Sequence, residues 1–239
     1  MLEAAHPVHS ETVASALAWW ADAGVDTLVS EEPTPWLARA AKPIPAPVSA
    51  PVQATAPLSL ADLIARLRTL SALDDVAPAS QRLPASGPAE ADLMAIIDMP
   101  EPGDIAAGAL ISGEAGELFD RMLGAIQRDR TSCYVIALCP ARSAGGMIPA
   151  DKVGQLAVLA RLHIEFSGAQ RVWVMGQTAS RALIGADARP GRGEKRFINH
   201  NGGNVDAVAS FSPRLLLQNA KLKKAAWDDM QALMRGLTA

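Results

Sequence analysis

The sequence predicts an α/β fold with three layers, in which helices cover both faces of a central, mostly parallel, four-stranded sheet. Two observations support this. Short apolar runs alternate with longer amphipathic segments along the C-terminal part of the chain, a pattern typical of parallel sheets. The 239 residues are 49% hydrophobic, which allows one domain of ordinary size plus extra segments. Strands are predicted at 93–98, 133–138, 171–175 and 207–211, and helices at 113–127, 151–166, 178–183 and 221–237.

Composition divides the chain into three zones, namely an arm at 1–39, a linker at 40–57 and a domain at 58–239. The linker has five prolines and almost no charge, so we expect an extended, semi-rigid segment. The domain opens with Ser59 and Asp62, which form a helix-start signal. The apolar face of the helix that follows consists of Leu60, Leu63, Ile64, Leu67 and Leu70.

The arm is acidic and rich in tryptophan. Residues 1–36 carry six Asp or Glu and no Lys or Arg, whereas the rest of the chain has a net charge of +3. This asymmetry suggests two different partners. We expect the arm to bind a protein and fold on binding, since tryptophans are common interface anchors. The alternative is that its tryptophans pack on the domain as an extra helix. The candidate partner-binding residues are Leu17, Trp19, Trp20, Val25, Trp36 and Leu37.

No membrane segment, cofactor or metal is expected. No apolar run reaches the roughly 18 residues that span a bilayer, and the N-terminus lacks a signal-peptide pattern, so a cytoplasmic location is the expectation. The two cysteines, Cys133 and Cys139, are too few for a disulfide framework or a four-cysteine metal site. Being six residues apart in one predicted strand, they should point to the same face as small, buried side chains.

Several motifs follow one another in the order of a known family. IDMPE at 97–101 is followed by GALISGEAGELFDRML at 108–123. Three further segments begin at Tyr134, Val174 and Ser210. In order and spacing, these resemble the GEAPG, GxPFVGxAGxLLDxML, YITNVVKCRPP, LGxxAxxxLLG and HPAYLLR motifs of the family 4 uracil-DNA glycosylases. The resemblance covers about 150 residues and implies the uracil-DNA glycosylase fold.

The departures from the family fall on the residues that do its chemistry. The resemblance places Ile111 where the family stacks uracil on a Phe, Ala137 where an Asn reads the base, and Ser212 where a His supports the leaving base. The acidic residue of the first motif is retained only as Asp98, and a bulky Glu101 replaces a glycine. A cluster cysteine of the family corresponds to Ala141, and none lies between residues 58 and 82, so we expect no iron–sulfur cluster.

Basic residues gather in two C-terminal segments that we expect to be loops. They are a solvated face, which is the usual role of charged residues, or a DNA-binding surface. The resemblance adds weight to the second interpretation, because the family's DNA groove lies near 212–218. The candidates are Arg189, Arg192, Lys195, Arg196, Arg214, Lys221, Lys223 and Lys224.

Other polar residues allow a functional and a structural interpretation. Ser212 is a candidate nucleophile, although the sequence shows no nearby base to activate it. The turn after Gly176 is an anion site or a plain strand–helix turn. His200 lies in a glycine-containing run that either contacts a phosphate or is a flexible turn. His163 is expected to be half-buried on a helix.

These features together predict a non-catalytic accessory protein of bacterial DNA replication or repair, binding a protein partner and DNA. The arm is similar in kind to the tryptophan-containing N-terminal peptide of psi, a glycosylase-like subunit of the bacterial DNA polymerase III clamp loader. That similarity implies a clamp-loader partner. The alternative is an active, divergent glycosylase for uracil or another damaged base, in which Asp98 or Glu101 positions a water molecule.

Overall fold

The chain divides into two compact units, Met1–Ala54 and Thr55–Ala239. The computed structural model describes residues 59–235 of the second unit and residues 14, 15, 18–20 and 22 of the first. The predicted linker at 40–57 lies outside the described residues. None of the described helices is both long and apolar enough to cross a membrane.

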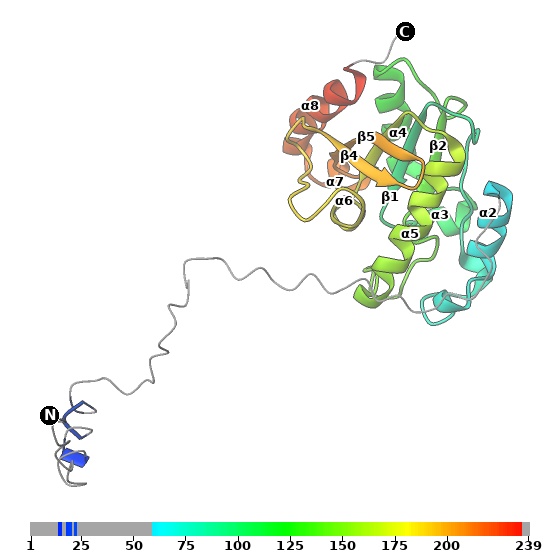
Figure 1. Cartoon of the computed structure of the whole chain (residues 1–239). Helices are drawn as coiled ribbons and strands as arrows, with labels where there is room; N and C mark the ends of the chain where they lie inside the picture. The colour runs from blue at the N-terminus through cyan, green and yellow to red at the C-terminus, as the bar shows by residue number, and fades with distance from the viewer. Residues whose placement is uncertain (1–13, 16–17, 21, 23–58, 236–239) are drawn as a thin grey trace, which may run out of the picture. The chain divides into compact units, whose positions relative to one another are not determined.

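A five-stranded sheet forms the centre of the second unit, in the order β2-β1-β3-β5-β4 (Figure 1). The first four strands in that order run parallel, and β4 pairs antiparallel to β5. The predicted α/β class with a mostly parallel sheet is therefore confirmed, with five strands in place of four. The strands are β1 (Leu93–Ile97), β2 (Cys133–Ala137), β3 (Arg171–Met175), β4 (Lys195–His200) and β5 (Gly203–Ser210).

Strand β4 replaces a segment that we expected to be a loop. Its sequence is mostly polar, and Ile198 is its only fully buried residue because β4 forms one edge of the sheet. His200 pairs with Gly203, so only two residues, Asn201 and Gly202, form the turn to β5. The run that contains His200 thus has a turn, as one of the two interpretations expected, but His200 itself lies in a strand. It ends a strand, and its Nδ1 accepts a hydrogen bond from the N–H of Gly202 at 3.2 Å.

The helices follow the predicted pattern and add two short ones, α3 and α7, which each begin with a proline. Helix α2 begins as predicted, because the Ser59 hydroxyl accepts a hydrogen bond from the N–H of Asp62 at 3.2 Å. The helices are α2 (Leu60–Thr69), α3 (Pro102–Ala107), α4 (Gly113–Ala125), α5 (Ala150–Ser167), α6 (Gln177–Leu183), α7 (Pro213–Gln218) and α8 (Lys223–Met234). Short 3-10 helices occur at η1 (Ser71–Leu73), η2 (Ala79–Gln81) and η3 (Ala220–Leu222).

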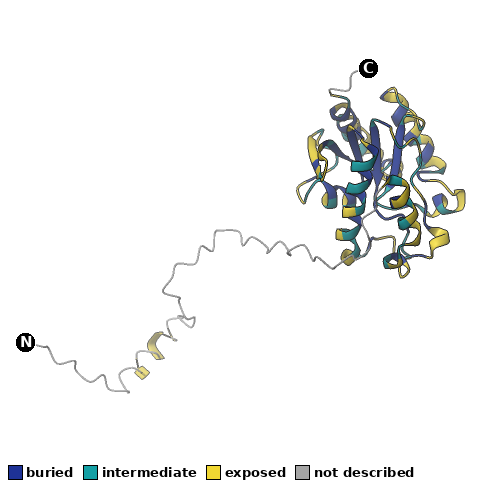
Figure 2. Ribbon diagram, turned by 45° about the vertical axis from the view of Figure 1, so that its right-hand side comes forward, coloured by how far each residue is buried: buried dark blue, intermediate teal, exposed yellow. Residues whose placement is uncertain are grey.

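Two hydrophobic cores lie on opposite faces of the sheet, and Figure 2 shows the buried strands between partly exposed helices. Side chains of α5 and α6 fill the first core, and those of α4, α7 and α8 fill the second. Alternate residues of β1, β2, β3 and β5 contribute to the two cores; in β3, Val172 and Val174 face the first, and Trp173 and Met175 the second. Burial on both faces explains why the parallel strands read as continuous apolar runs.

Candidate functional site

The candidate site is a cleft at the carboxyl ends of the parallel strands, where open α/β sheets commonly bind ligands. Its volume is about 140 Å³. The segments that follow β1, β2 and β5 meet there with the first turns of α3 and α7. Its lining consists of Ile97, Asp98, Met99, Glu101, Asp104, Ile111, Ala115, Arg142, Gly146, Met175, Ser212, Pro213 and Arg214. The cleft therefore brings together three of the four positions that the sequence singled out, namely Asp98, Ile111 and Ser212.

Ile111 forms one wall of the cleft in an unusual backbone conformation. Its φ is 54°, in the left-handed region where a β-branched residue costs about 1–2 kcal/mol. The surrounding structure holds it there. Its carbonyl accepts a hydrogen bond from Arg130 Nη2 at 2.7 Å, and the backbone of Gly116 lies so close to that carbonyl that a Cβ atom would not fit. The wall is thus built with backbone strain but offers a buried aliphatic side chain, with no aromatic face on which a base can stack.

Asp98 acts as the cap of α6. Its Oδ1 accepts a hydrogen bond from the N–H of Ala179 at 2.7 Å. Burial raises the pKa of its carboxyl, while backbone hydrogen bonds from Ala179, Thr178 and Gln177 work in the opposite direction. The predicted anion site at the turn after Gly176 is therefore occupied by the chain's own carboxylate. Of the two interpretations left open for that turn, this contact favours the strand–helix turn.

Asp104 is a buried carboxylate that ties two walls of the cleft together. Its Oδ2 accepts a hydrogen bond from the N–H of Glu101 at 2.9 Å, at the start of α3. Its Oδ1 accepts two more, from the N–H and from the Oγ of Ser112, each at 2.6 Å. Ser112 directly follows the strained Ile111, so Asp104 fixes the position of both segments. Sequence reasoning did not single out Asp104, although an acid three residues after Glu101 is a helix-start signal.

Glu101 lies at the mouth of the cleft between two arginines. Its Oε2 accepts a hydrogen bond from Arg142 Nη1 at 3.2 Å and another from Arg214 Nη1 at 2.5 Å. Arg142 is also held by the carbonyl of Pro100, at 2.9 Å. The sequence pointed to Arg214 as a DNA contact, whereas Arg142, which lies in the segment that begins at Tyr134, was not singled out. The glutamate that replaces the family's glycine therefore places a bulky, charged side chain at the entrance of the cleft.

Ser212 is the N-cap of α7, and its Oγ accepts a hydrogen bond from the N–H of Leu215 at 3.3 Å. The described lining of the cleft contains no His and no Lys. A nucleophilic serine needs such a base to remove its proton. The geometry thus favours a capping role for Ser212 over the nucleophilic one.

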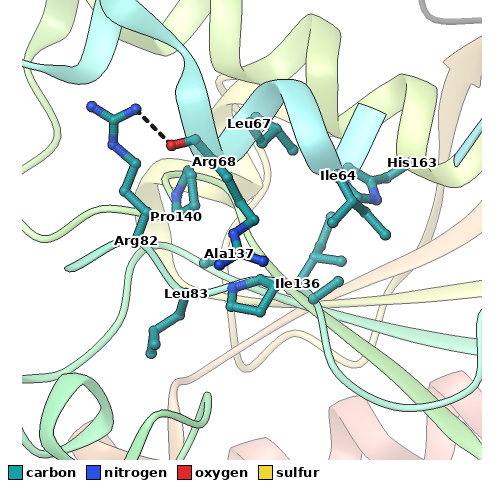
Figure 3. A pocket seen from close by; sticks show the side chains of 11 residues that line it. Ile64, Leu67, Arg68, Arg82, Leu83, Ile136, Ala137, Pro140 and His163 are labelled. Atoms are coloured by element: carbon teal, nitrogen blue, oxygen red, sulfur yellow. Dashed lines mark hydrogen bonds between the residues drawn. The ribbon is translucent and has the colours of Figure 1, made fainter. Parts of the chain in front are cut away.

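Ala137 does not line the cleft with the other three positions. It pairs with Ile97 in the sheet and lines a separate, small pocket of about 20 Å³ under α2 (Figure 3). Arg82 and His163 also line that pocket. His163 is buried rather than half-buried, and burial lowers its pKa to about 4. Its Nδ1 lies 3.3 Å from the hydroxyl of Tyr134, so it is a packing residue with one polar partner.

The basic candidates are only partly loop residues, and most are paired with acids. Arg192 and Arg196 both contact Glu194, at 3.8 and 2.7 Å. Lys195 contacts Asp206 at 2.8 Å, and Lys224 contacts Asp228 at 3.7 Å. Lys195 and Arg196 belong to β4, Arg214 to α7, Lys221 to η3, and Lys223 and Lys224 to α8. In the part of the chain that the structure describes, the candidates without an ion pair are Arg189, Lys221 and Lys223.

The loop that carries Arg189 and Arg192 is clamped to α8 by a buried carboxylate. Asp229 accepts hydrogen bonds from the N–H groups of Gly191 and Gly193, each at 2.8 Å. Burial raises the pKa of the Asp229 carboxyl. Sequence reasoning missed this clamp, which fixes where the basic loop is presented.

The cysteines do not fit an iron–sulfur cluster. The prediction that Cys133 and Cys139 share a face is wrong, because β2 ends at Ala137 and the alternation of the strand does not continue to Cys139. Cys133 lies in one core and Cys139 in the other, and burial raises the pKa of both thiols. Ala141, at the position of a family ligand, is fully buried. Among residues 59–235 and the six described residues of the arm, no group of three His, Cys, Asp or Glu is arranged to hold a metal.

In the arm, the described residues are helical, and Trp19 and Trp20 are 66% and 50% exposed. Their rings meet edge to face, with centroids 5.7 Å apart. The other partner-binding candidates, Leu17, Val25, Trp36 and Leu37, lie outside the described residues.

Comparison with known proteins identifies the family. A search among curated proteins finds no match to this chain. The family model of the uracil-DNA glycosylase superfamily matches residues 84–231, which run from the segment before β1 into α8 and include the whole cleft. The match covers more than half of the chain, so the protein belongs to the uracil-DNA glycosylase superfamily.

Proposed function

We propose that this protein is a non-catalytic member of the superfamily that serves as an accessory protein in DNA replication or repair. The observation that carries the proposal is the chemistry of the cleft. Ile111 and Ser212 occupy positions where the resemblance expects a stacking ring and a histidine, and the Asp98 carboxylate is engaged in capping α6. The cleft lies within the part of the chain that matches the family, and by the resemblance its residues differ from the groups that excise a base.

Base excision needs a pocket that stacks the extruded base and satisfies its polar edge. It also needs a donor aimed at the charge that builds on the leaving base, and one such donor is worth about 3–4 kcal/mol. Ala137 has no polar side-chain atom, and it lines a different pocket. Ser212 donates at most one neutral hydrogen bond. Stacking of the base, recognition of its polar edge and support of the leaving base are thus each weakened, at Ile111, Ala137 and Ser212 respectively.

One observation favours the alternative, an active and divergent glycosylase. Asp98 and Glu101 are carboxylates in the same cleft, and burial raises the pKa of Asp98. Raised carboxyl pKa values are common at catalytic sites. Against it, the hydrogen bond from Ala179 and the two arginines on Glu101 engage both carboxylates.

An excision assay on single- and double-stranded uracil-DNA distinguishes the two. We expect no turnover by the natural protein. Because Ala137 lies outside the cleft, the informative gain-of-function variant is I111F/S212H. It should gain more activity than either single change, because groups that act on one transition state are not additive. Robust turnover by the natural protein that disappears in D98N and E101Q variants would establish the divergent enzyme instead.

The arm is proposed to bind the protein partner. Its described tryptophans are exposed, and residues 1–36 carry only negative charge, so the partner surface should be basic or apolar. A replication or repair complex is the proposed partner, with the clamp loader suggested by the similarity to psi.

A W20A/W36A variant should lose the complex in a pull-down from the native cell without a change in melting temperature. W227A, which alters an exposed tryptophan of α8, is the matched control. A variant that melts several degrees lower and still binds would make the arm structural.

A DNA contact is proposed for the domain, carried by Arg189, Lys221 and Lys223, the candidates that form no ion pair with another described residue. Residues 59–235 contain 20 Lys and Arg and 19 Asp and Glu, a net charge of only +1. Non-specific DNA binding should therefore be weak and strongly dependent on salt. Binding that is insensitive to salt, or absent at low salt, would contradict this contact.

A further inference from the structure

A single oxygen at the mouth of the cleft is shared by two guanidinium groups. Arg142 Nη1 and Arg214 Nη1 both donate to Oε2 of Glu101, at 3.2 and 2.5 Å. A non-bridging phosphate oxygen carries negative charge and accepts from arginine in the same way. The three side chains come from different elements: Glu101 precedes α3, Arg142 follows β2, and Arg214 lies in the first turn of α7.

We propose that Arg142 and Arg214 form a phosphodiester-binding site, and that the Glu101 carboxylate occupies this site when no DNA is bound. The inference rests on the proposed DNA contact and adds to it a position and a competitor within the chain.

The other two carboxylates of the cleft are held by N–H groups, whereas Glu101, the N-cap of α3, is also held by the two arginines. Asp98 accepts from the N–H of Ala179, and Asp104 accepts from the N–H groups of Glu101 and Ser112. Their positions follow from helix capping and do not depend on the arginines. Of the three carboxylates that line the cleft, Glu101 is the one held by cations, so only this side chain has to be displaced to free them.

The arginines differ in how firmly they are placed, as expected for a site that is partly preformed. Arg142 is 18% exposed, and its second hydrogen bond, to the carbonyl of Pro100, keeps it in place when Glu101 leaves. Arg214 is 48% exposed and Glu101 30%, so both side chains have room to move. A DNA phosphate that enters the mouth would therefore meet one fixed donor and one mobile donor.

Glu101 also sets the charge of the cleft. Three carboxyl groups and two guanidinium groups line it, so the lining has one more acidic than basic side chain. Binding of a polyanion such as DNA is then disfavoured for two reasons. Arg142 and Arg214 already donate to Glu101, and the acidic lining repels negative charge. Replacing Glu101 with glutamine removes the charge but keeps the shape, which makes E101Q the informative variant.

The experiment measures the affinity of the full-length protein for labelled single-stranded and duplex oligonucleotides over a range of salt concentrations. E101Q should bind on the order of tenfold tighter than the natural protein at low salt, since both arginines are then free to donate charged hydrogen bonds to a phosphate. The logarithmic salt dependence for single strands should steepen by about 0.7 for each additional phosphate that the protein neutralises. Inorganic phosphate, added as a competitor, should reduce the increase in affinity, because it shares the chemistry of the proposed ligand.

Two variants separate the site from a general charge effect. E90Q changes the net charge equally at an exposed residue before β1, at the opposite end of that strand from the cleft, and should not alter affinity. R214A, introduced into E101Q, should abolish the increase, whereas its exposed position should leave the melting temperature unchanged.

Equal affinity of E101Q and the natural protein, or an equal increase in E90Q, would overturn the proposed site. Such a result would leave the non-catalytic function standing, because the excision assay and the capture of a partner by the arm test that function separately.

Discussion

The carboxylate of Asp98 lies directly against the backbone of Gly176, and a Cβ atom at Gly176 would overlap it. Gly176 has φ 156° and ψ 155°, a region that glycine alone adopts without strain. This contact lets the end of β1 reach the first turn of α6, where Asp98 accepts the N–H of Ala179. The glycine is thus required by the cap, which engages Oδ1 of the Asp98 carboxylate.

Replacing Gly176 with alanine should destabilise the domain by about 3 kcal/mol, from backbone strain together with the overlap with Asp98. For a domain of this size, that corresponds to a fall of roughly 10 °C in melting temperature. G154A is the control, since Gly154 lies in α5 with open space around it and should gain about 0.5–1 kcal/mol. An unchanged melting temperature for G176A would mean that the Asp98 contact is not kept in solution.

His163 should make the domain sensitive to acid. Burial lowers its pKa from 6.5 to about 4, so the folded state binds this proton more weakly than the unfolded state. The free energy of unfolding is therefore unaffected above pH 6.5 and falls as the pH drops from 6.5 towards 4. The loss is on the order of 3 kcal/mol. H163Q keeps a polar partner for Tyr134 but cannot titrate in this range.

Denaturant unfolding at several pH values checks this. The stability difference between the natural protein and H163Q should shift in favour of H163Q across that window. All other groups titrate in both proteins, so the difference isolates His163. If the free energies of unfolding of the two proteins change in parallel with pH, then His163 can be protonated in the folded state without loss of stability.

The parallel core could be predicted from the sequence, whereas one edge of it could not. The strands that contain Val172 and Met94 are buried on both faces, so they read as apolar runs. Strand β4 buries only Ile198 fully, and its exposed Phe197 and polar neighbours resemble a loop. The face of Cys139 was mispredicted for a related reason, because strand alternation ends where the strand ends, and the sequence does not mark that point at Ala137.

The cleft was only partly predictable for a similar reason. Asp98, Ile111 and Ser212 were found because each aligns with a family motif. The pairing of Arg142 and Arg214 on Glu101 depends on contacts between segments more than 40 residues apart. No local pattern carries such a contact, and a charged residue in a sequence most often indicates a solvated surface. Ala137 also aligns with a family motif, but it lines the pocket under α2 and not the cleft, which the motif did not indicate.

Arg82 should be a major stabilising residue of the region under α2. Its guanidinium donates to the carbonyls of Ala77, Arg68 and Leu70 and contacts Asp74 at 2.6 Å, while its side chain is fully buried. Figure 3 shows the bond from Arg82 to Arg68 beside the pocket that Ala137 lines. R82M should leave these carbonyls without a donor and cost about 3 kcal/mol.

The matched control for Arg82 is R128M. Arg128 contacts Asp92 at 2.7 Å, but both side chains are partly exposed, so its loss should cost less than about 1 kcal/mol. R82K, which keeps the charge but not the planar set of donors, should fall between the two. Equal losses in R82M and R128M, measured by denaturant unfolding, would show that the buried contacts of Arg82 contribute no more than a surface pair.

Asp104 should control the order of the cleft as well as its stability. Its carboxylate accepts three hydrogen bonds, from the N–H of Glu101 and from the N–H and Oγ of Ser112. In D104N one side of the group becomes a donor, and at least one N–H then faces another donor in a buried site. We expect a loss of about 2–3 kcal/mol in the free energy of unfolding. S112A removes only the hydroxyl partner and should cost about 1 kcal/mol.

Amide hydrogen exchange gives the sharper readout, since D104N should lose protection at Glu101 and Ser112 while the amides of β3 stay protected. If protection at both residues survives in D104N, then the first turn of α3 and the strained segment at Ile111 are held by other contacts, and Asp104 does not organise the cleft.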